Sequence, residues 1–369
     1  MIYLDYNATT PIDHAVADAM LPYIREHFGN PSSGHPIGRA ARRAVEAGRT
    51  ALAVLIGASP EEVVFTGSGT EASNMAIKGV ARLRESAGKH FVTTVVEHPA
   101  TLNPMRWLDK FGYSRTEVPV DATGLVDPDD IRKAIRPDTI LISVMHAQNE
   151  VGTIEPVAEI GRIAREAGIL YHVDAAQSVG KVSVNVNELN ADFLSIAGHK
   201  LYAPKGIGAL YLRKGLDLEP LVHGGSQESG RRAGTENVIM IAGLGKAAEL
   251  AAAYLQESGH EELRDLFWQK LSDAFGDRVL LNGHPTQRLS GTLNVSFPGH
   301  VGGEILARLD GVCASTGAAC HAGDAKPSAV LLAMGHDHQR AVGTIRFSLG
   351  RPTTRGEIDS VVEMLKEIL

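Results

Sequence analysis

The sequence predicts an α/β fold: a large domain with a mostly parallel sheet between layers of helices, and a smaller α+β domain. Short apolar runs alternate with amphipathic helical stretches between residues 63 and 173, and this alternation is typical of parallel sheets covered on both faces. The chain has 369 residues, which is more than a single hydrophobic core usually supports, so two domains are expected.

The large domain opens with helices and continues with strand–helix pairs. A loop at residues 29–36 separates two helical stretches, 13–28 and 37–56, because its Gly, Asn, Pro and Ser residues each favour a turn. The expected strands that follow are residues 63–65, 91–96, 140–144 and 169–173, with helices at 70–85, 100–110 and 157–167. Functional sites in such sheets form at the carboxyl ends of the strands.

The small domain is expected after a glycine-rich polar stretch, residues 224–237, and an alanine-rich helix at 238–256. Its expected strands are residues 279–281, 293–297 and 344–349. We therefore assign residues 14–256 to the large domain, and residues 1–13 with 257–369 to the small domain.

Composition narrows the class of function. The net charge of −7 provides no basic stripe for nucleic acid, and no apolar run is long enough to span a bilayer. The N-terminus lacks the charged start and apolar core of a signal peptide. Only Cys313 and Cys320 are present, which favours a reducing compartment. We expect a cytoplasmic protein with no nucleic-acid partner, no membrane partner and no metal site.

The turn Gly198-His199-Lys200 lies between two short apolar runs, 193–196 and 207–212, which we expect to be strands. A lysine held at the end of a sheet, away from acidic neighbours, can lose its proton when it is desolvated. The neutral amine of Lys200 could then form a Schiff base with a carbonyl compound. The alternative is an ordinary solvated lysine in a hairpin.

The turn Gly67-Ser68-Gly69-Thr70 follows an expected strand and opens a helix. Backbone amides at a helix N-terminus favour a phosphate, and the Thr70 hydroxyl adds a donor. The same stretch matches the G-x-G-x-x-A dinucleotide fingerprint, with Glu97 ending the next strand where a ribose-binding acid is expected. Binding of a lone phosphate, binding of a dinucleotide and simple helix capping are therefore all open for this turn.

Polar side chains end several other expected strands. Asp174 could hold a protonated ring nitrogen with Gln177 donating to a ring oxygen, and His98 could stack on a flat ring and move protons. Asn149 is a further strand-end amide. Each residue alone has an ordinary interpretation, such as helix capping. Together with a phosphate-binding turn and a reactive lysine they favour pyridoxal phosphate, and a nicotinamide oxidoreductase is the remaining rival.

Cys320 lies in a stretch of small and polar residues, 314–328, that fits neither a strand nor a helix. A thiol on such a loop could reach a substrate and then a second partner, and His321 beside it could lower the thiol pKa or relay a proton. Cys313 ends an apolar run, so we expect it to be buried and structural. Cys320 could also be an idle loop thiol.

Several motifs together resemble the NifS-like cysteine desulfurases and selenocysteine lyases, which are class V relatives of the aminotransferases. The motifs that carry the resemblance are residues 4–10 (Leu-Asp-Tyr-Asn-Ala-Thr-Thr), 29–33, 198–200, 232–237 (Arg-Ala-Gly-Thr-Glu-Asn) and 345–351 (Ile-Arg-Phe-Ser-Leu-Gly-Arg). The resemblance implies fold type I of the pyridoxal-phosphate enzymes, with a mostly parallel seven-stranded sheet in the large domain, and a homodimer.

The resemblance also implies how pyridoxal phosphate is held. Lys200 would carry the cofactor, His98 would stack on its ring and act in catalysis, and Asp174 would pair with the ring nitrogen. Gln177 and Asn149 would lie near the phenolic oxygen and the substrate. The residues that would bind the phosphate are Gly69, Thr70, His199 and, from the other subunit, Thr235.

For the substrate, the resemblance implies that Asn30 and Arg346 hold its carboxylate, which suits the planar fork of arginine. Asn149 would lie beside them, and Cys320 would take the sulfur as a persulfide. Ala197 departs from the pattern, because many relatives have a phosphate-binding serine at that position.

The expected reaction is the conversion of L-cysteine to L-alanine, with sulfur passed to Cys320 and on to an acceptor such as an iron–sulfur scaffold protein. The pair Cys320-His321, followed by Pro327-Ser328, resembles the selenocysteine lyases more closely, so L-selenocysteine is the alternative substrate. An alternative from a different class is a catalytically weak scaffold that binds a sulfur acceptor. A scaffold would need neither the lysine turn nor the strand-end acid.

Overall fold

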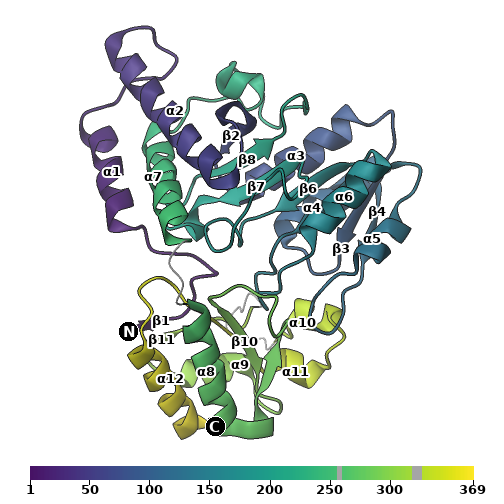
Figure 1. Cartoon of the computed structure of the whole chain (residues 1–369), viewed down its shortest axis with the longest axis vertical. Coiled ribbons are helices and arrows are strands. Elements are labelled where there is room, and N and C mark those ends of the chain that lie inside the picture. Colours follow the sequence, from purple (N-terminus) through teal and green to yellow (C-terminus); the bar gives the residue numbers. More distant parts are fainter. Residues whose placement is uncertain (256–259, 318–325) are drawn as a thin grey trace.

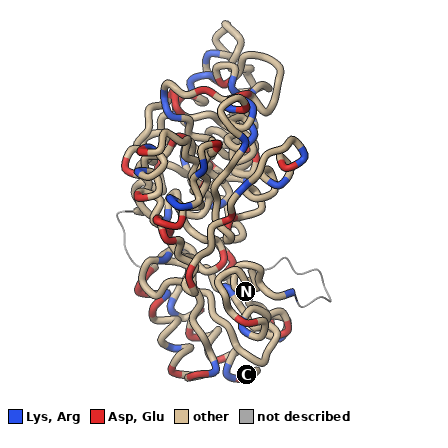
Figure 2. The backbone as a smooth tube through the Cα atoms, turned by 90° about the vertical axis from the view of Figure 1, so that its right-hand side faces the viewer, with Lys and Arg blue, Asp and Glu red and all other residues tan. Residues whose placement is uncertain are grey.

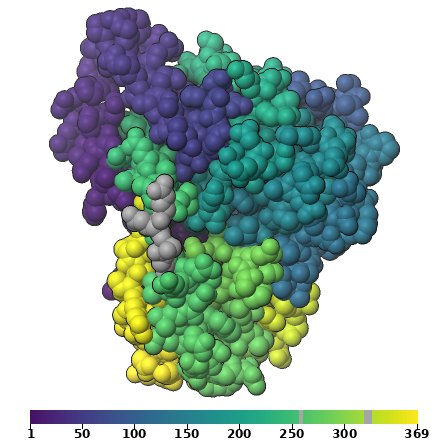
Figure 3. Space-filling view, viewed as in Figure 1, coloured from purple at the N-terminus to yellow at the C-terminus, as the bar shows by residue number. Residues whose placement is uncertain are grey.

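The computed structural model describes residues 1–255, 260–317 and 326–369. The molecule has two parts, which lie one above the other in Figure 1. In Figure 3 the purple and teal segments fill the upper part, and the lower part is mostly green and yellow. The upper part is built on a seven-stranded sheet and the lower part on a three-stranded sheet.

The large sheet confirms the predicted α/β class. Its strands are β2 (Val63–Thr66), β3 (His90–Thr94), β4 (Ser114–Val118), β5 (Thr139–Met145), β6 (Leu170–Asp174), β7 (Phe193–Ala197) and β8 (Gly208–Leu212). They lie in the order β2-β8-β7-β6-β5-β3-β4, and β8 alone runs antiparallel to its neighbours. The carboxyl ends of the other six strands therefore meet at one edge.

Helices cover both faces of this sheet because successive strand residues point to opposite sides. Val63 and Phe65 of β2 belong to one apolar core, whereas Val64 between them belongs to another. The helices of the first core are α2 (Pro36–Ile56), α6 (Val157–Ala167) and α7 (Val238–Tyr254), with α1 (His14–Arg25) and α5 (Pro128–Ala134) packed beside them. The helices of the second core are α3 (Gly69–Leu83) and α4 (Pro99–Leu108).

The lower part combines the C-terminal third of the chain with its first residues. Its antiparallel sheet has the order β12-β10-β9, formed by β9 (Leu280–Asn282), β10 (Thr292–Ser296) and β12 (Thr344–Ser348). Its helices are α8 (His260–Phe275), α9 (Gly302–Arg308), α10 (Ala329–Ala333), α11 (His338–Val342) and α12 (Arg355–Ile368). Strand β1 (Ile2–Tyr3) pairs in parallel with β11 (Val312–Cys313), and Leu4 is buried in the apolar core of this lower part.

Three details differ from the expectations. Strand β4 and helices α5 and α8 to α11 are absent from the predicted elements, and β4 lacks an apolar run because it is a half-exposed strand at the sheet edge. Helix α1 ends at Arg25 instead of residue 28. Cys313 is half-buried rather than buried, because its two-residue strand pairs only with the equally short β1.

Within the described ranges, no helix is both long enough and apolar enough to cross a bilayer. Charged residues of both signs are interspersed over the upper and lower parts in Figure 2.

Candidate active site

A cavity of about 340 Å³ opens at the carboxyl ends of the large sheet, with walls from both parts of the molecule. The predicted site residues that line it are Gly69, Thr70, His98, Asn149, Asp174, Gln177, His199, Lys200 and Arg346. Asn30 and Thr235 do not line it, and Cys320 lies outside the described residues. The structure therefore brings together most of a site whose members come from distant segments of the chain.

Lys200 ends a single 3₁₀ turn, Gly198–Lys200, directly after β7. Its Nζ donates to the backbone oxygen of Asn7 and, at 2.7 Å, to that of Ala8. Burial lowers the pKa of Lys200 to about 8, with a further contribution from Arg346, while Asp5 and Asp174 oppose the shift. The neutral amine that Schiff-base chemistry requires is therefore accessible close to neutral pH.

Asp174 ends β6 and is only 6% exposed. One carboxylate oxygen accepts a hydrogen bond from the Ala176 N–H at 3.0 Å, and no ion pair to Asp174 is found among the described residues. Burial raises the pKa of Asp174, and the Ala176 N–H, His98 and Lys200 oppose that shift. This carboxylate can therefore hold a cationic group of a ligand that enters the cavity.

His98 caps the N-terminus of α4 and lies at the cavity wall. Its Nδ1 accepts from the Ala100 N–H at 3.1 Å, so the ring hydrogen is carried by Nε2. Burial and Lys200 lower the pKa of His98, whereas Asp174 raises it. The ring can therefore stack on a flat ligand in its neutral form.

The phosphate-binding turn lies where α3 begins. Ser68 accepts from the Glu71 N–H at 3.1 Å and caps the helix, while Gly69 and Thr70 line the cavity. A Cβ atom on Gly208 of β8 would lie 2.5 Å from the Ser68 carbonyl carbon, so only glycine allows the turn to approach the sheet so closely. The positive end of α3 therefore faces the cavity, as an anion-binding helix does.

His199 also lines the cavity. Its Nδ1 lies 3.2 Å from the Thr9 hydroxyl. Burial, together with Lys200, Lys205 and Lys181, lowers the pKa of His199 to about 4, so the ring is neutral at physiological pH. A neutral imidazole can still donate one N–H to a phosphate.

Arg346 reaches the cavity from β12 in the lower part. Its guanidinium donates to Asp5 Oδ1 and to the backbone oxygen of Asn149, both at 2.8 Å. Arg346 is 5% exposed, and these contacts hold its side chain in one orientation. A substrate carboxylate would meet this guanidinium beside the Asp5 carboxylate.

Glu97 does not take the ribose-binding position that the dinucleotide interpretation requires. It is 5% exposed and does not line the cavity. Its Oε1 accepts from the Thr94 hydroxyl and from the Met145 N–H, both at 2.9 Å. Glu97 therefore links neighbouring strands beneath the site.

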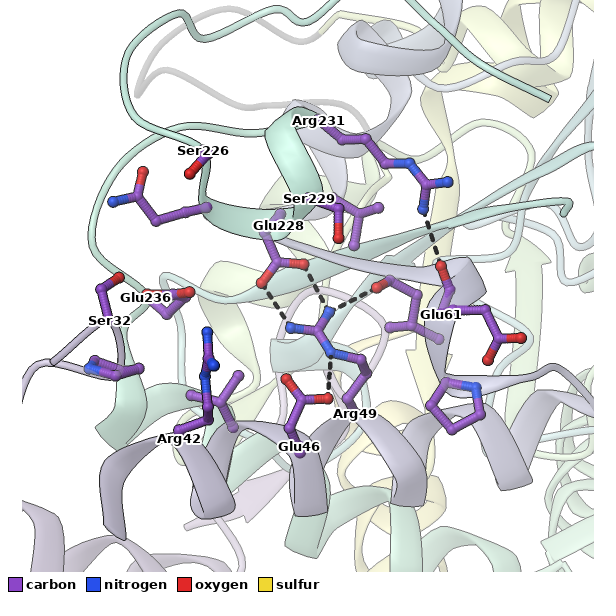
Figure 4. A pocket seen from close by; sticks show the side chains of 16 residues that line it. Ser32, Arg42, Glu46, Arg49, Glu61, Ser226, Glu228, Ser229, Arg231 and Glu236 are labelled. Atoms are coloured by element: carbon purple, nitrogen blue, oxygen red, sulfur yellow. Dashed lines mark hydrogen bonds and ion pairs between the residues drawn. The ribbon is translucent and has the colours of Figure 1, made fainter. Parts of the chain in front are cut away.

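Asn30 and Thr235 lie outside the cavity of their own chain, next to a second hollow. Pro31 and Glu236, which follow them in the sequence, line a larger surface cavity of about 630 Å³. Figure 4 shows Arg49 between Glu46 and Glu228 among the residues that line this cavity. Two predicted site residues are thus sequence neighbours of residues that line this second cavity.

The ion pair in that hollow anchors the glycine-rich stretch 224–237. Arg49 donates two hydrogen bonds to Glu228, at 2.7 and 2.9 Å, and Glu228 also accepts from the Phe65 N–H at 3.0 Å. Glu228 and Ser229 both have left-handed backbone conformations, with φ of 50° and 57°. Non-glycine residues adopt this conformation only when their surroundings hold them there.

Three polar residues at the site have no role in the predicted set. Asn7 lines the cavity and contacts Lys200, Gln177 and Lys181. Asp5 pairs with Arg346, and Lys181 donates to Gln177. The polar turn after the first strand is a signal for Asn7 and Asp5, whereas no pattern in the sequence singles out Lys181.

Comparison with known proteins identifies the family. Residues 2–361 match the family Aminotransferase class-V. The chain belongs to the class-V aminotransferases. Over its full length it is 50% identical to cysteine desulfurase IscS of Dictyoglomus turgidum, covering 94% of that protein, and 48% identical to cysteine desulfurase IscS of Methanosarcina thermophila, covering 92%.

Solved structures give the same result for this class-V chain. A NifS-like protein that is 38% identical superposes with a TM-score of 0.93 and covers 100% of this chain and 98% of that one. A protein described as SspA in complex with cysteine is 36% identical, with a TM-score of 0.85 and coverage of 95% and 99%. The expected fold type I of the pyridoxal-phosphate enzymes is confirmed, and the alternative interpretation as a nicotinamide oxidoreductase is wrong.

Class-V aminotransferases depend on pyridoxal phosphate, and the cavity fits that cofactor. Its aldehyde suits the Lys200 amine, and its ring nitrogen suits Asp174, a buried carboxylate that has no ion pair within the described part of the chain. Its phosphate suits the N-terminus of α3 with Thr70 and His199. Ala197 also lines the cavity and offers no hydroxyl to the phosphate.

Proposed function

We propose that this chain is a pyridoxal-phosphate-dependent cysteine desulfurase that converts L-cysteine to L-alanine and transfers the sulfur to Cys320. One observation carries the proposal: a lysine of lowered pKa, a buried carboxylate free of ion pairs among the described residues and an arginine from the second sheet meet in one cavity. Full-length similarity to proteins named cysteine desulfurase supports the choice of substrate.

Bound pyridoxal phosphate supplies an electron sink for the bonds at the substrate's α-carbon. Lys200 would hold the cofactor and, as a neutral amine, would accept and return the proton of that carbon. Asp174 would favour the protonated ring nitrogen, and His98 would stack on the ring and move protons. Arg346, with Asn149 beside it, orients the substrate carboxylate through its planar guanidinium.

The sulfur leaves to a thiol of the protein. The Cys320 thiolate attacks the substrate sulfur, the bond between that sulfur and the β-carbon breaks, and a sulfur–sulfur bond forms. The β-carbon takes up a proton, so the products are one L-alanine and one persulfide, and no outside oxidant or reductant is needed. An acceptor such as an iron–sulfur scaffold protein then receives the persulfide sulfur.

We also propose a homodimer in which Thr235 of one subunit reaches the cofactor phosphate of the other, with Asn30 at the same face. The support is the position of both residues beside the cavity of about 630 Å³, outside the site of their own chain. Sedimentation at the mass of a single chain would contradict this proposal.

The domain assignment stays as a proposal, with residues 14–256 forming the large domain and residues 1–13 and 257–369 the small one. The pairing of β1 with β11, and of Leu4 with the core of the lower part, supports joining the two ends of the chain. We further propose that the protein acts in the cytoplasm.

The proposal is tested with two cysteine variants and two substrates. We expect Cys320→Ala to lose L-cysteine desulfuration, because the thiol that receives the sulfur is removed. Cys313→Ala is the matched control and should retain it, since Cys313 lies in a short strand away from the cavity. Intact-mass measurement should find the additional sulfur on Cys320 only. Wild-type desulfuration rates in Cys320→Ala would contradict the persulfide mechanism.

Selenocysteine lyase is the second candidate, favoured by the Cys320-His321 pair before Pro327-Ser328. The carbon–selenium bond is weaker than the carbon–sulfur bond, so it can break with its electron pair left on the β-carbon. That carbon takes up a proton to give L-alanine, and the selenium atom departs without a thiolate to receive it. Cys320→Ala should therefore keep part of its L-selenocysteine cleavage. A wild-type protein that turns over L-selenocysteine but not L-cysteine would favour the lyase, and one that turns over neither would favour the scaffold.

A further inference from the structure

Lys181 is held close to the site by the turn that follows β6. Its backbone N–H donates to the Ser178 oxygen at 2.9 Å. Gly180, with φ of 76°, precedes it, and a Cβ atom there would lie 2.0 Å from Leu201 Cδ1. Only glycine permits this close packing in a left-handed conformation, so the backbone determines where the Lys181 side chain begins.

The Lys181 amine contacts two amide side chains. Its Nζ lies 2.7 Å from Gln177 Oε1 and 2.9 Å from Asn7 Oδ1. Lys181 does not line the cofactor cavity, whereas Gln177 and Asn7 both do. The hydrogen bonds of Lys181 therefore reach the cavity through these two amides, while its charge acts on His199 and Lys200.

The contacts decide which way each amide points. Gln177 Nε2 donates to the Asn7 backbone oxygen at 2.9 Å, and Asn7 Nδ2 donates to the Asn149 backbone oxygen at 3.3 Å. Backbone oxygens only accept and a lysine amine supplies N–H groups, so reversing either amide would place two donors or two acceptors face to face. Each amide oxygen is thus directed at Lys181 and each amide nitrogen away from it.

Lys181 has no carboxylate partner among the described residues. Burial, Lys200 and Arg346 lower the pKa of Lys181 to about 7. The neutral and the charged amine both carry at least two N–H groups, so both forms can make the two contacts. A lysine placed there serves as a double donor rather than as half of an ion pair.

We propose that Lys181 is a positioning residue, which fixes the Gln177 amide so that its second N–H group faces the cofactor's phenolic oxygen. The same amine holds Asn7, whose backbone oxygen accepts from Lys200. Without Lys181 the Gln177 amide can rotate and present its oxygen to another oxygen atom. The role of Lys181 rests on the proposed function, because it acts on the cofactor that Gln177 contacts.

The experiment measures binding of pyridoxal phosphate to apoprotein in a double-mutant cycle of Lys181→Met and Gln177→Ala. We expect Lys181→Met to raise the dissociation constant about tenfold in the wild-type background and to have little effect when Gln177 is already alanine. Equal effects in both backgrounds, or no effect in either, would overturn the role of Lys181. If wild-type protein takes up no pyridoxal phosphate, the proposed function fails instead.

Lys205→Met is the matched control. Lys205 is exposed and also lowers the pKa of His199, so it tests the loss of a nearby positive charge without the loss of an amide contact. We expect its dissociation constant to stay within twofold of wild type, and a tenfold rise would overturn the positioning role. Should Lys181→Met fail to fold, Lys181→Gln takes its place in the same cycle with the same two outcomes.

Discussion

Two buried carboxylates, Glu228 and Asp174, differ in whether the protein supplies a cationic partner. Glu228 is 9% exposed and accepts hydrogen bonds from two nitrogens of Arg49 and from a backbone N–H. Asp174 is 6% exposed, accepts a hydrogen bond from the Ala176 N–H and has no ion pair within the described part of the chain. The charge of Glu228 is neutralised by an arginine of the protein, whereas Asp174 is available to pair with a positively charged group of a ligand.

The difference indicates how burial can serve either structure or function. A buried carboxylate with a bidentate arginine partner is costly to disrupt, because the arginine would be left charged and unpaired. Burial raises the pKa of a carboxylate that has no cationic partner, and the buried charge destabilises the protein when no ligand is bound. Such groups are typical of functional sites. Glu228 should therefore matter for stability and Asp174 for turnover.

The largest expected effect comes from the amine beside Asp174. Lys200→Ala should lower turnover at least about a thousandfold, on the scale of other lost nucleophiles, and remove the visible absorbance of the bound cofactor. Alanine release and absorbance spectra measure the two effects. Normal alanine release with undiminished absorbance would contradict the assignment of Lys200.

Asp174→Asn should have the next largest effect. We expect kcat to fall about 10²- to 10³-fold, as for the loss of other electrostatic groups in active sites, while the protein stays folded. The reason is that a neutral amide cannot keep the ring nitrogen protonated. Stopped-flow or steady-state assays of cofactor-saturated enzyme test this, and near-normal turnover would count against the pairing.

Glu228→Gln should have the opposite effect to Asp174→Asn, lowering stability more than turnover. The free energy of unfolding should drop by about 3 kcal/mol, because the buried Arg49 loses its bidentate carboxylate and keeps only the exposed Glu46, at 3.3 Å. Glu61→Gln is the matched control, since Glu61 is exposed in the same surface cavity and its loss should leave the unfolding midpoint unchanged. Denaturant unfolding of both variants measures the difference. Equal stability of the two would contradict a structural role for Glu228.

The smallest expected effect is a pH-dependent gain in stability. The pKa of Lys200 is about 8 in the folded apoprotein against 10.5 for a free lysine, so the folded state disfavours the charged amine. Below pH 8 this cost is fully present, and it disappears as the pH rises toward 10.5. Apoprotein of Lys200→Met should therefore be about 1–3 kcal/mol more stable than wild type at pH 7.

Denaturant unfolding at pH 7 and pH 10.5 checks that prediction, because the advantage of Lys200→Met should shrink at the higher pH. Lys205→Met serves as a control, since its exposed amine does not pay a burial cost. A gain in stability that is the same at both pH values would show that packing, and not charge, is responsible.

Local patterns in the sequence were sufficient for the layers and for most of the site. Strand–helix alternation predicted the parallel sheet, and its geometry brought Thr70, His98, Asp174 and Lys200 to one edge, as expected. Such predictions succeed because strand ends of one parallel sheet must meet, whatever the rest of the chain does.

Only the tertiary structure decided the connections between distant segments. Arg346 with Asp5, Arg49 with Glu228, and Lys181 with Asn7 are all contacts between segments far apart in the chain. No periodicity or spacing in the sequence records which buried donor meets which acceptor, because burial and partner choice arise when separate layers pack. For the same reason, the sequence could name Asp174 and Glu228 as acids but not say which of them has an arginine.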